Sequence, residues 1–274
     1  MAGQIGNGGL SILGAAPYRN MSKMRKPMII AHRGASALAG ENTIESFEKA
    51  IEIGTDMIEF DVRRTKDHVL VAHHDRFIHE TLIRDLTYRE IENSFPSKTN
   101  HVAMIEEIVK FAKGKTRMDA HVKEEGYENE VIQHLARDLE EDEFVVTSFN
   151  DSSLKTIKSN YPSVKAGLIL GRPKPKEYIR TRISELFPMR RCGNAKADFL
   201  VPHLKLVRFG FLKRAEKNHK PVYVWTVNDE RMIERFLKEN RVQGIITDLP
   251  ELAVKVRNRI FPTEYTFDRH DDMK

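Results

Sequence analysis

The stretch Asp56-Met57-Ile58-Glu59-Phe60-Asp61-Val62 decides how the rest of the chain is interpreted. It is an apolar run that carries two carboxylates at positions i and i+2, and its composition predicts a β-strand. Because strand side chains alternate between two faces, Glu59 and Asp61 are expected to share one face. Two anions held so close repel each other unless a cation lies between them, and such oxygen pairs suit Mg²⁺ or Ca²⁺. The alternative is an ordinary strand end with one core-facing and one solvated acid.

Apolar runs alternate with helical patterns along the chain. The expected strands are Met28–Ala31, Asp56–Val62, Arg117–Val122, Phe144–Thr147, Lys165–Leu170, Phe199–Val201, Val222–Val227 and Gly244–Asp248. The expected helices between and after them are Glu41–Ile53, Met104–Ala112, Asn129–Leu139, Ser152–Ser159, Val207–Asn218, Asp229–Glu239 and Glu251–Ile260, with a basic loop and helix over Arg172–Arg191. Such alternation implies a parallel sheet, and eight units in 274 residues favour a closed (β/α)₈ TIM barrel over an open sheet.

One further strand, Val69–Ala72, does not fit this alternation. It begins only a few residues after Val62, whereas a parallel crossover needs a dozen residues or more. It is therefore expected to form an antiparallel β-hairpin, inserted after the second strand of the barrel. We expect a single domain over residues 25–262, preceded by a flexible leader or tag at 1–24 and followed by a polar tail at 263–274.

Composition narrows the class of protein. The net charge of +5 is modest, charges of both signs are spread along the chain, and no basic stripe with interleaved aromatics indicates nucleic-acid binding. An anionic small molecule suits this balance. The single cysteine, Cys192, rules out an internal disulfide and fits a reducing, cytoplasmic compartment. No apolar run reaches the ~18 residues of a transmembrane segment, and the oligomeric state stays open.

Polar residues gather where the expected strands end, which is where such barrels carry their active sites. The strand-end motifs are His32-Arg33-Gly34, Glu59-Phe60-Asp61, His73-His74-Asp75, His121-Val122-Lys123, Trp225-Thr226-Val227-Asn228 and Thr247-Asp248. Hydrolysis of a phosphate ester builds negative charge, which a metal ion and cationic side chains stabilise while histidines move protons. The ring therefore indicates phosphate-ester chemistry. His73 neighbours His74 along a strand and is expected to face away.

These motifs, together with Glu41-Asn42-Thr43 and Thr247-Asp248-x-Pro250, resemble the glycerophosphodiester phosphodiesterase family. The resemblance runs from Met28 to Arg259. It implies a barrel of the type argued above with a hairpin after the second strand. It also implies a metal-dependent enzyme of lipid and glycerol metabolism that hydrolyses glycerophosphodiesters to an alcohol and glycerol 3-phosphate.

Carried over residue by residue, the resemblance implies the following roles. His32 and His74 form the general acid/base pair. Glu59 and Asp61, with position 121, bind one divalent metal ion, which is Mg²⁺, Ca²⁺ or a first-row transition metal. The remaining residues bind substrate: Arg33 and Lys123 hold the phosphate, Glu41 and Asn42 belong to the same site, and Trp225 forms an apolar wall. Glu41 either pairs with Arg33 or is an acid favoured by the dipole at a helix N-terminus.

The chain departs from the family pattern at His121, where the family has the glutamate of a Glu-x-Lys motif. A nitrogen ligand there favours transition metals over Mg²⁺ and Ca²⁺. Alternatively His121 only hydrogen-bonds a ligated water or a neighbouring acid, or Asp119 on the same strand face takes part instead. Two other functions stay open. One is a lysophospholipase D-type hydrolase, favoured if an apolar groove lies beside the basic residues Arg172, Lys174, Lys176, Arg180 and Arg182. The other is a non-catalytic phosphate-binding barrel.

Overall fold

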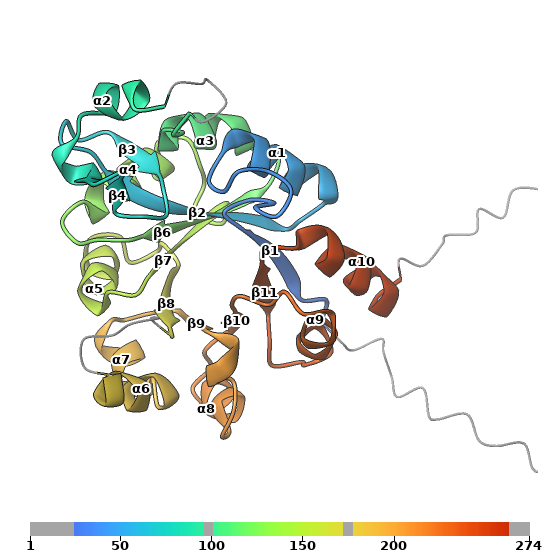
Figure 1. Ribbon diagram of the computed structural model, residues 1–274. Coiled ribbons are helices and arrows are strands. Elements are labelled where there is room, and N and C mark those ends of the chain that lie inside the picture. The colour runs from blue at the N-terminus through green and yellow to red at the C-terminus, as the bar shows by residue number, and fades with distance from the viewer. Residues whose placement is uncertain (1–24, 96–100, 172–177, 263–274) are drawn as a thin grey trace, which may run out of the picture.

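Strands and helices alternate along the chain, and the strands close into a barrel (Figure 1). The computed structural model describes residues 25–95, 101–171 and 178–262. The barrel strands are β1 (Met28–His32), β2 (Met57–Arg64), β6 (Arg117–Val122), β7 (Phe144–Ser148), β8 (Ala166–Leu170), β9 (Phe199–Pro202), β10 (Tyr223–Val224) and β11 (Gly244–Thr247). They are parallel, in the order β10-β11-β1-β2-β6-β7-β8-β9, and the parallel bridges Leu200↔Val222 and His203↔Trp225 join β9 to β10. The predicted (β/α)₈ barrel is confirmed.

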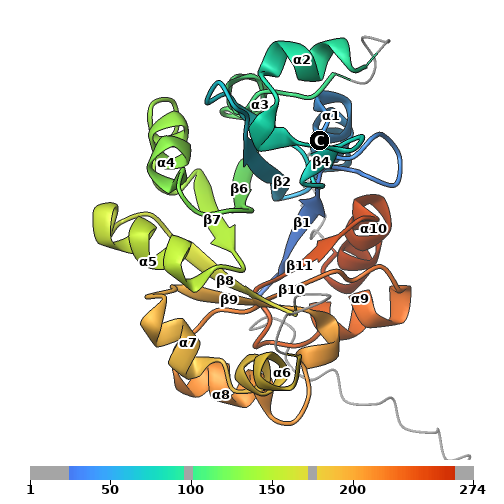
Figure 2. The same ribbon diagram turned by 60° about the vertical axis from the view of Figure 1, so that its left-hand side comes forward.

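Helices stand outside this ring of strands (Figures 1 and 2). The helices that connect the barrel strands are α1 (Ile44–Ile53), α3 (Ile105–Ala112), α4 (Glu128–Ala136), α5 (Asp151–Asn160), α7 (Met189–Asn194), α8 (Phe211–Lys217) and α9 (Glu230–Leu237), and α10 (Pro250–Ile260) follows the last strand. The helix α6 (Tyr178–Leu186) is an additional one between β8 and α7. No helix within the described ranges is long and apolar enough to cross a bilayer.

The segment between β2 and α3 begins as the hairpin that the short loop predicts. Strand β3 (Leu70–Ala72) pairs antiparallel with the end of β2, with Val62 opposite Ala72 and Arg64 opposite Leu70. The small strands β4 (Phe77–Ile78) and β5 (Thr81–Leu82) and the helix α2 (Tyr88–Asn93) follow it. This segment brings His73 and His74 back toward the end of β2, since the His73 amide donates to the Asp61 carbonyl at 3.0 Å.

Several predicted boundaries were wrong, each for a local reason. The helix predicted over Glu41–Ile53 begins at Ile44, because Thr43 caps it by accepting the Ser46 amide proton. The segment Arg172–Arg191 was predicted as a basic loop and a helix, and its described part holds two helices, α6 and the start of α7, with Pro188 between them. The strand predicted over Val222–Val227 is reduced to Tyr223–Val224. The predicted leader and the polar tail lie outside the described residues.

Strand periodicity sorts side chains between the barrel interior and the layer under the helices. Outward-facing residues such as Ile58 and Phe60 belong to the main core beneath the helices. Inside the barrel, a second apolar cluster fills the lower levels: Ile30, Met57, Val145, Ile169, Phe199, Val201 and Ile246. The polar site sits above this cluster, on the same inward-facing rows. The packed interior therefore acts as the floor of the site.

Gly167 makes room for the largest of these interior side chains. It pairs with Phe199 on the neighbouring strand, and a Cβ atom at residue 167 would lie 2.1 Å from the Phe199 ring. We expect Gly167→Ala to lower the free energy of unfolding by about 1–3 kcal/mol, because the ring has to leave its position. Urea unfolding measures the change.

Gly193→Ala is the matched control, since Gly193 lies in α7 with no heavy atom of another element within 4 Å of the added Cβ. Alanine there is expected to leave stability unchanged or to raise it by about 0.5–1 kcal/mol. The double variant Gly167→Ala/Phe199→Leu should recover part of the loss. Equal effects of the two glycine substitutions would contradict this account of the interior.

Candidate active site

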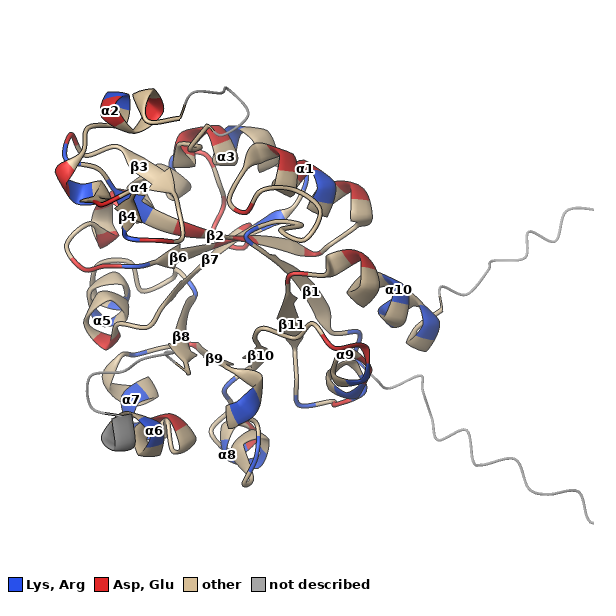
Figure 3. Cartoon of the chain, in the orientation of Figure 1, with Lys and Arg blue, Asp and Glu red and all other residues tan. Residues whose placement is uncertain are grey.

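A cavity of about 280 Å³ opens at the C-terminal ends of the barrel strands. Strands β1, β2 and β6 and the segment after β3 contribute most of its polar side chains, and Figure 3 shows acidic and basic segments meeting around β1 and β2. These polar residues are His32, Arg33, Glu59, Asp61, His74, Asp119, His121 and Lys123. The other arc of the barrel contributes apolar side chains: Phe149, Ile169, Val201, Trp225 and Ile246. The cavity is therefore polar on one side and apolar on the other.

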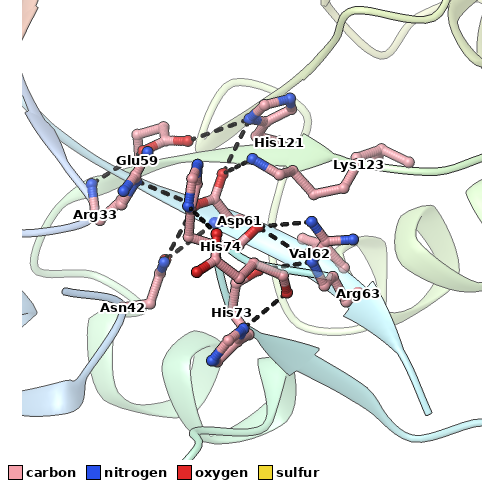
Figure 4. Close-up of polar contacts among 12 residues, drawn as sticks. Arg33, Asn42, Glu59, Asp61, Val62, Arg63, His73, His74, His121 and Lys123 are labelled. Atoms are coloured by element: carbon pink, nitrogen blue, oxygen red, sulfur yellow. Dashed lines mark hydrogen bonds and ion pairs between the residues drawn. The ribbon is translucent and has the colours of Figure 1, made fainter. Parts of the chain in front are cut away.

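The carboxylates of Glu59 and Asp61 meet the imidazole of His121 at the polar side (Figure 4). Parallel pairing places Asp61 beside His121 in register, and period two keeps Glu59 on the same face. Nδ1 of His121 lies 3.0 Å from Asp61 Oδ1 and 3.7 Å from Glu59 Oε1. The two carboxylates are 4% and 1% exposed, so a cluster of buried ligand atoms forms where the sequence predicts it.

This cluster fits a divalent metal ion. One ligand atom from each of Glu59, Asp61 and His121 lies within 4.8 Å of the others, which is compatible with a shared ion at ~2.0–2.6 Å from each. Only Nδ1 of His121 faces the carboxylates, and its Nε2 is buried without a hydrogen-bond partner among the described residues. The predicted convergence of the three side chains is thus confirmed, and the donor set is two oxygens and one nitrogen.

Asp119 lies next to this cluster but is not part of it. It pairs with Glu59 in register, is 2% exposed, and accepts a hydrogen bond from Thr147 Oγ1 at 2.8 Å. Burial, reinforced by the negative charges of Glu59 and Asp61, raises the pKa of Asp119 well above its usual value. This shift favours the neutral form of Asp119, which would not add a third negative charge to the interior.

Two cations compensate the charge of Asp61. Lys123 Nζ lies 2.8 Å from Asp61 Oδ1, and Arg33 Nε lies 3.1 Å from Oδ2. Burial alone would raise the pKa of Asp61, but the His121 hydrogen bond and these cations hold the pKa well below its usual value. Both cations also line the cavity, so they stand between the buried carboxylate and any anion that enters.

Glu41 and Asn42 bind two polar residues of the cavity, Arg33 and Asp61. Glu41 Oε2 accepts from Arg33 Nη1 at 2.6 Å, so the predicted pairing is confirmed. Asn42 is 4% exposed and binds Asp61 twice: its Nδ2 donates to Oδ2 at 3.2 Å, and its Oδ1 accepts the Asp61 amide proton at 3.0 Å. Neither residue is among those that line the cavity. The structure thus brings Asn42 to the carboxylate rather than to the cavity surface.

His32 is held by an acid from the other end of the chain. Its Nδ1 lies 2.5 Å from Asp248 Oδ1. Asn228 Nδ2 donates to Asp248 Oδ2 at 2.6 Å, while Asn228 Oδ1 accepts the Asp248 amide proton at 3.0 Å. Burial lowers the pKa of His32, but the hydrogen bond to Asp248 and the charge of Glu59 outweigh it, so the pKa is raised.

His74 faces the same cavity in a different environment. Burial, then the positive charges of Lys123 and Arg33, lower the pKa of His74. The buried Arg63 positions its backbone, because Arg63 Nη2 donates to the His74 carbonyl at 2.6 Å and Nε to the His73 carbonyl at 3.1 Å (Figure 4). His73 Nδ1 instead lies 2.8 Å from the Asp75 carbonyl, and His73 does not line the cavity, as predicted.

Trp225 lies in the apolar wall, as predicted. Its Nε1 donates to the Leu170 carbonyl at 3.0 Å, and its ring packs edge-on against Phe149 and His203 at 5.6 and 5.4 Å between centroids. Phe149 in turn lies 5.5 Å from the His121 ring. The indole thus has its polar atom satisfied and presents carbon to the cavity.

The partnerships of Asp248, Asn228 and Arg63 were missed in the sequence. Asp248 and Asn228 do stand at strand ends, which is the one signal that pointed to them, while nothing in the sequence marks Arg63. Of the predicted basic stretch, Arg172, Lys174 and Lys176 lie outside the described residues. Arg182 forms an ion pair with Glu185 at 2.6 Å.

Comparison with known proteins agrees with this geometry. A model of the glycerophosphoryl diester phosphodiesterase family matches residues 32–252. A glycerophosphodiester phosphodiesterase of Caldanaerobacter subterraneus is 28% identical over 249 residues, covering 84% of this chain and 98% of the relative. The crystal structure of a glycerophosphodiester phosphodiesterase from Parabacteroides distasonis is 26% identical, with a TM-score of 0.72 over 85% of this chain and 98% of that one.

A phosphodiesterase from Oleispira antarctica, solved in complex with the product sn-glycerol-3-phosphate, shares the fold. It has a TM-score of 0.70 at 20% identity, over 86% of this chain and 97% of that one. The family match spans both the polar and the apolar arcs of the barrel and every residue that lines the cavity. The chain therefore belongs to the glycerophosphoryl diester phosphodiesterase family, whose members are phosphoric diester hydrolases.

Proposed function

We propose that this protein hydrolyses glycerophosphodiesters to an alcohol and glycerol 3-phosphate by metal-dependent histidine acid/base catalysis. The observation that carries the proposal is the meeting of two histidines, two cations and the Glu59/Asp61/His121 cluster in one cavity. The Oleispira antarctica protein of the same fold, in complex with sn-glycerol-3-phosphate, supports this substrate class. The single cysteine, buried and free, supports the cytoplasmic location that the sequence predicts.

Arg33 and Lys123 bind the phosphate in this proposal, because both present positive charge to the cavity from the carboxylate side. Glu59, Asp61 and His121 would hold one divalent ion. When bound, that ion would stabilise the negative charge that develops on the phosphoryl oxygens. Asn42 and Glu41 keep the carboxylate and the guanidinium oriented.

The opposite pKa shifts of the two histidines suggest their roles. His74, whose pKa is lowered, is neutral near pH 7 and accepts the proton of the attacking water. The raised pKa of His32 favours its protonated form, which donates the proton to the leaving alkoxide. Asp248 supports this role, since it fixes the imidazole through Nδ1 and leaves Nε2 for the substrate.

A lysophospholipase D-type reaction on the same site is the second candidate. The apolar arc of the cavity favours it, because Phe149, Ile169 and Trp225 suit a leaving group or acyl chain with carbon surface. The two candidates share their chemistry and differ only in substrate. A single substrate panel separates them.

The panel compares glycerophosphocholine, glycerophosphoethanolamine and lysophosphatidylcholine, each with and without added divalent metal. We expect metal-dependent release of glycerol 3-phosphate, and a loss of about 10²-fold or more in turnover for His32→Ala and His74→Ala. His73→Ala is the matched control and should keep its turnover. Activity of His32→Ala or His74→Ala within a few-fold of wild type would remove that residue from the mechanism. Absence of turnover with intact metal binding would support a phosphate-binding barrel.

Asp248→Asn tests the assignment of acid and base. The rate should rise with pH as His74 loses its proton and fall again as His32 loses its own. Without the Asp248 charge, burial lowers the pKa of His32, so the alkaline limb of kcat/KM should move to lower pH while the acid limb stays. Turnover should fall at least ~10-fold.

Asp75→Asn is the matched control, since Asp75 Oδ1 lies 2.9 Å from His74 Nδ1 and is exposed. It should leave the alkaline limb in place. An alkaline limb that moves in Asp75→Asn and not in Asp248→Asn would reverse the two roles.

His121→Glu tests the metal ligand. With a nitrogen donor the site should prefer Mn²⁺, Zn²⁺ or another first-row metal, and the all-oxygen variant should shift toward Mg²⁺ or Ca²⁺. Calorimetric titration of both proteins with the four ions measures the order of affinities without an activity assay. Identical orders in the two proteins would show that His121 is not a ligand.

A further inference from the structure

Five large apolar side chains are exposed in the described part of the chain: Leu38, Phe77, Ile183, Phe187 and Phe209. Each lies on a connection that leads from the C-terminal end of a strand to the next barrel helix. These connections start at the end of the barrel where the cavity opens. Exposed apolar surface of this kind marks interaction sites when it is clustered rather than scattered.

Three of the five form one patch over α6, α7 and α8, which lie side by side in Figures 1 and 2. Ile183 and Phe187 are one helical turn apart, and Arg214 stacks on the Phe187 ring at 4.7 Å. Arg214 also donates from Nη1 to the Phe209 carbonyl at 2.6 Å and from Nη2 to the Leu186 carbonyl at 2.8 Å. We call Ile183, Phe187, Phe209 and Arg214 the α6–α8 patch.

Phe209 is held in this patch at a conformational cost. Its φ is +49°, in the left-handed region that bulky residues rarely adopt, and its side chain is 75% exposed. Such a conformation persists only where the surroundings enforce it, as the bond from Arg214 to its carbonyl does here. Phe209 thus presents its phenyl ring to solvent. A smaller polar residue would adopt this positive φ more easily and would be better solvated at this exposed position.

The surroundings of the patch are strongly basic. Residues 181–217 contain nine Lys and Arg against three acids. Two of these acids are already neutralised, since Glu185 pairs with Arg182 and Asp198 with Lys158. Lys205, Arg208 and Lys213 are exposed and form no ion pair with any residue that the structure describes. Arg208 precedes the exposed Phe209, and Arg208 and Lys213 line the neighbouring groove between α8 and α9. Exposed apolar side chains with unpaired cations beside them match an anionic amphiphilic surface.

The patch also adjoins the apolar wall of the cavity. His203 packs edge-on against Trp225, and its Nδ1 accepts the backbone proton of Lys205 at 3.2 Å. Burial, then the charges of Lys205 and Arg182, lower the pKa of His203. His203 therefore joins Lys205 to the carbon-lined side of the site.

We propose that the α6–α8 patch docks on an anionic lipid surface. Phe187, Phe209 and Ile183 enter the interface between headgroups and acyl chains, while Lys205, Arg208 and Lys213 contact the headgroup phosphates. Docking there brings the apolar side of the cavity close to the lipid. The proposal concerns binding and does not depend on which phosphodiester is hydrolysed.

Flotation of the full chain with vesicles tests it. We expect the protein to float with vesicles that contain phosphatidylglycerol and not with pure phosphatidylcholine, and added salt should weaken the association. Ile183→Ser/Phe209→Asn should weaken binding by at least about 10-fold, because apolar burial is lost. Asparagine tolerates a positive φ, so the variant should fold. Lys205→Gln/Arg208→Gln should cost on the order of 5-fold per charge.

Two controls match these variants. Leu38→Ser removes an exposed apolar side chain outside the patch, and Lys110→Gln/Lys155→Gln removes two exposed charges from α3 and α5. Both should bind as wild type does. Absence of flotation, or equal losses in the controls, would overturn the proposal. So would a dimer that Ile183→Ser/Phe209→Asn dissociates, which would make a second copy the occupant. Binding to soluble polyglutamate that is insensitive to the apolar variant would point to an acidic protein instead.

Discussion

Burial of two carboxylates side by side is the constraint on which this site depends. Glu59 and Asp61 are almost fully removed from water, and Asp119 lies beside Glu59 on the neighbouring strand. Such a group of acids is stable only if protons, cations or hydrogen-bond donors compensate it. The chain uses all three: a raised pKa that favours the protonated form of Asp119, the charges of Arg33 and Lys123, and the Asn42 amide. The cations that face the cavity are therefore positioned by the same acids that form the metal-binding cluster.

The pKa values of His32 and His74 shift in opposite directions because the charged neighbours of the two histidines differ. His32 sits on β1 against an acid from the end of β11, so negative charge favours its protonated form. His74 sits on the segment after β3, near the same Lys123 and Arg33 that neutralise Asp61, so its neutral form is favoured. One set of cations thus offsets the charge of the buried carboxylate and lowers the proton affinity of one histidine. Opposite shifts of this kind are how one site holds an acid and a base at the same pH.

The polar and the apolar residues that line the cavity come from different parts of the barrel. Most of the charged side chains come from β1, β2 and β6 or directly follow these strands. The side chains at β7 to β11 are mostly apolar. The helices of the exposed α6–α8 patch follow β8 and β9, two strands of the apolar arc. Because neighbouring strands supply neighbouring parts of the rim, a polar headgroup and an apolar group of one substrate can meet matching walls without any separate binding domain.

Strand periodicity by itself determined much of this protein. It placed Glu59 with Asp61 and His121 with Lys123, and the short loop before Val69 required an antiparallel hairpin. The ordered strand-end motifs identified the family from residues alone. Local sequence patterns suffice here because alternation and loop length act over a few residues.

Only the tertiary structure decided which of these residues meet. His32 and Asp248 are 216 positions apart, and Arg63 reaches the carbonyls of His73 and His74 only because β3 folds back on β2. Asn42 turned to Asp61 because its positive φ aims the side chain inward from the loop. The protonation of His32 and His74 also depends on the tertiary structure, because charged residues from other parts of the chain shift the pKa of both. Closure of the barrel, a long-range event, is what brings these groups within bonding distance.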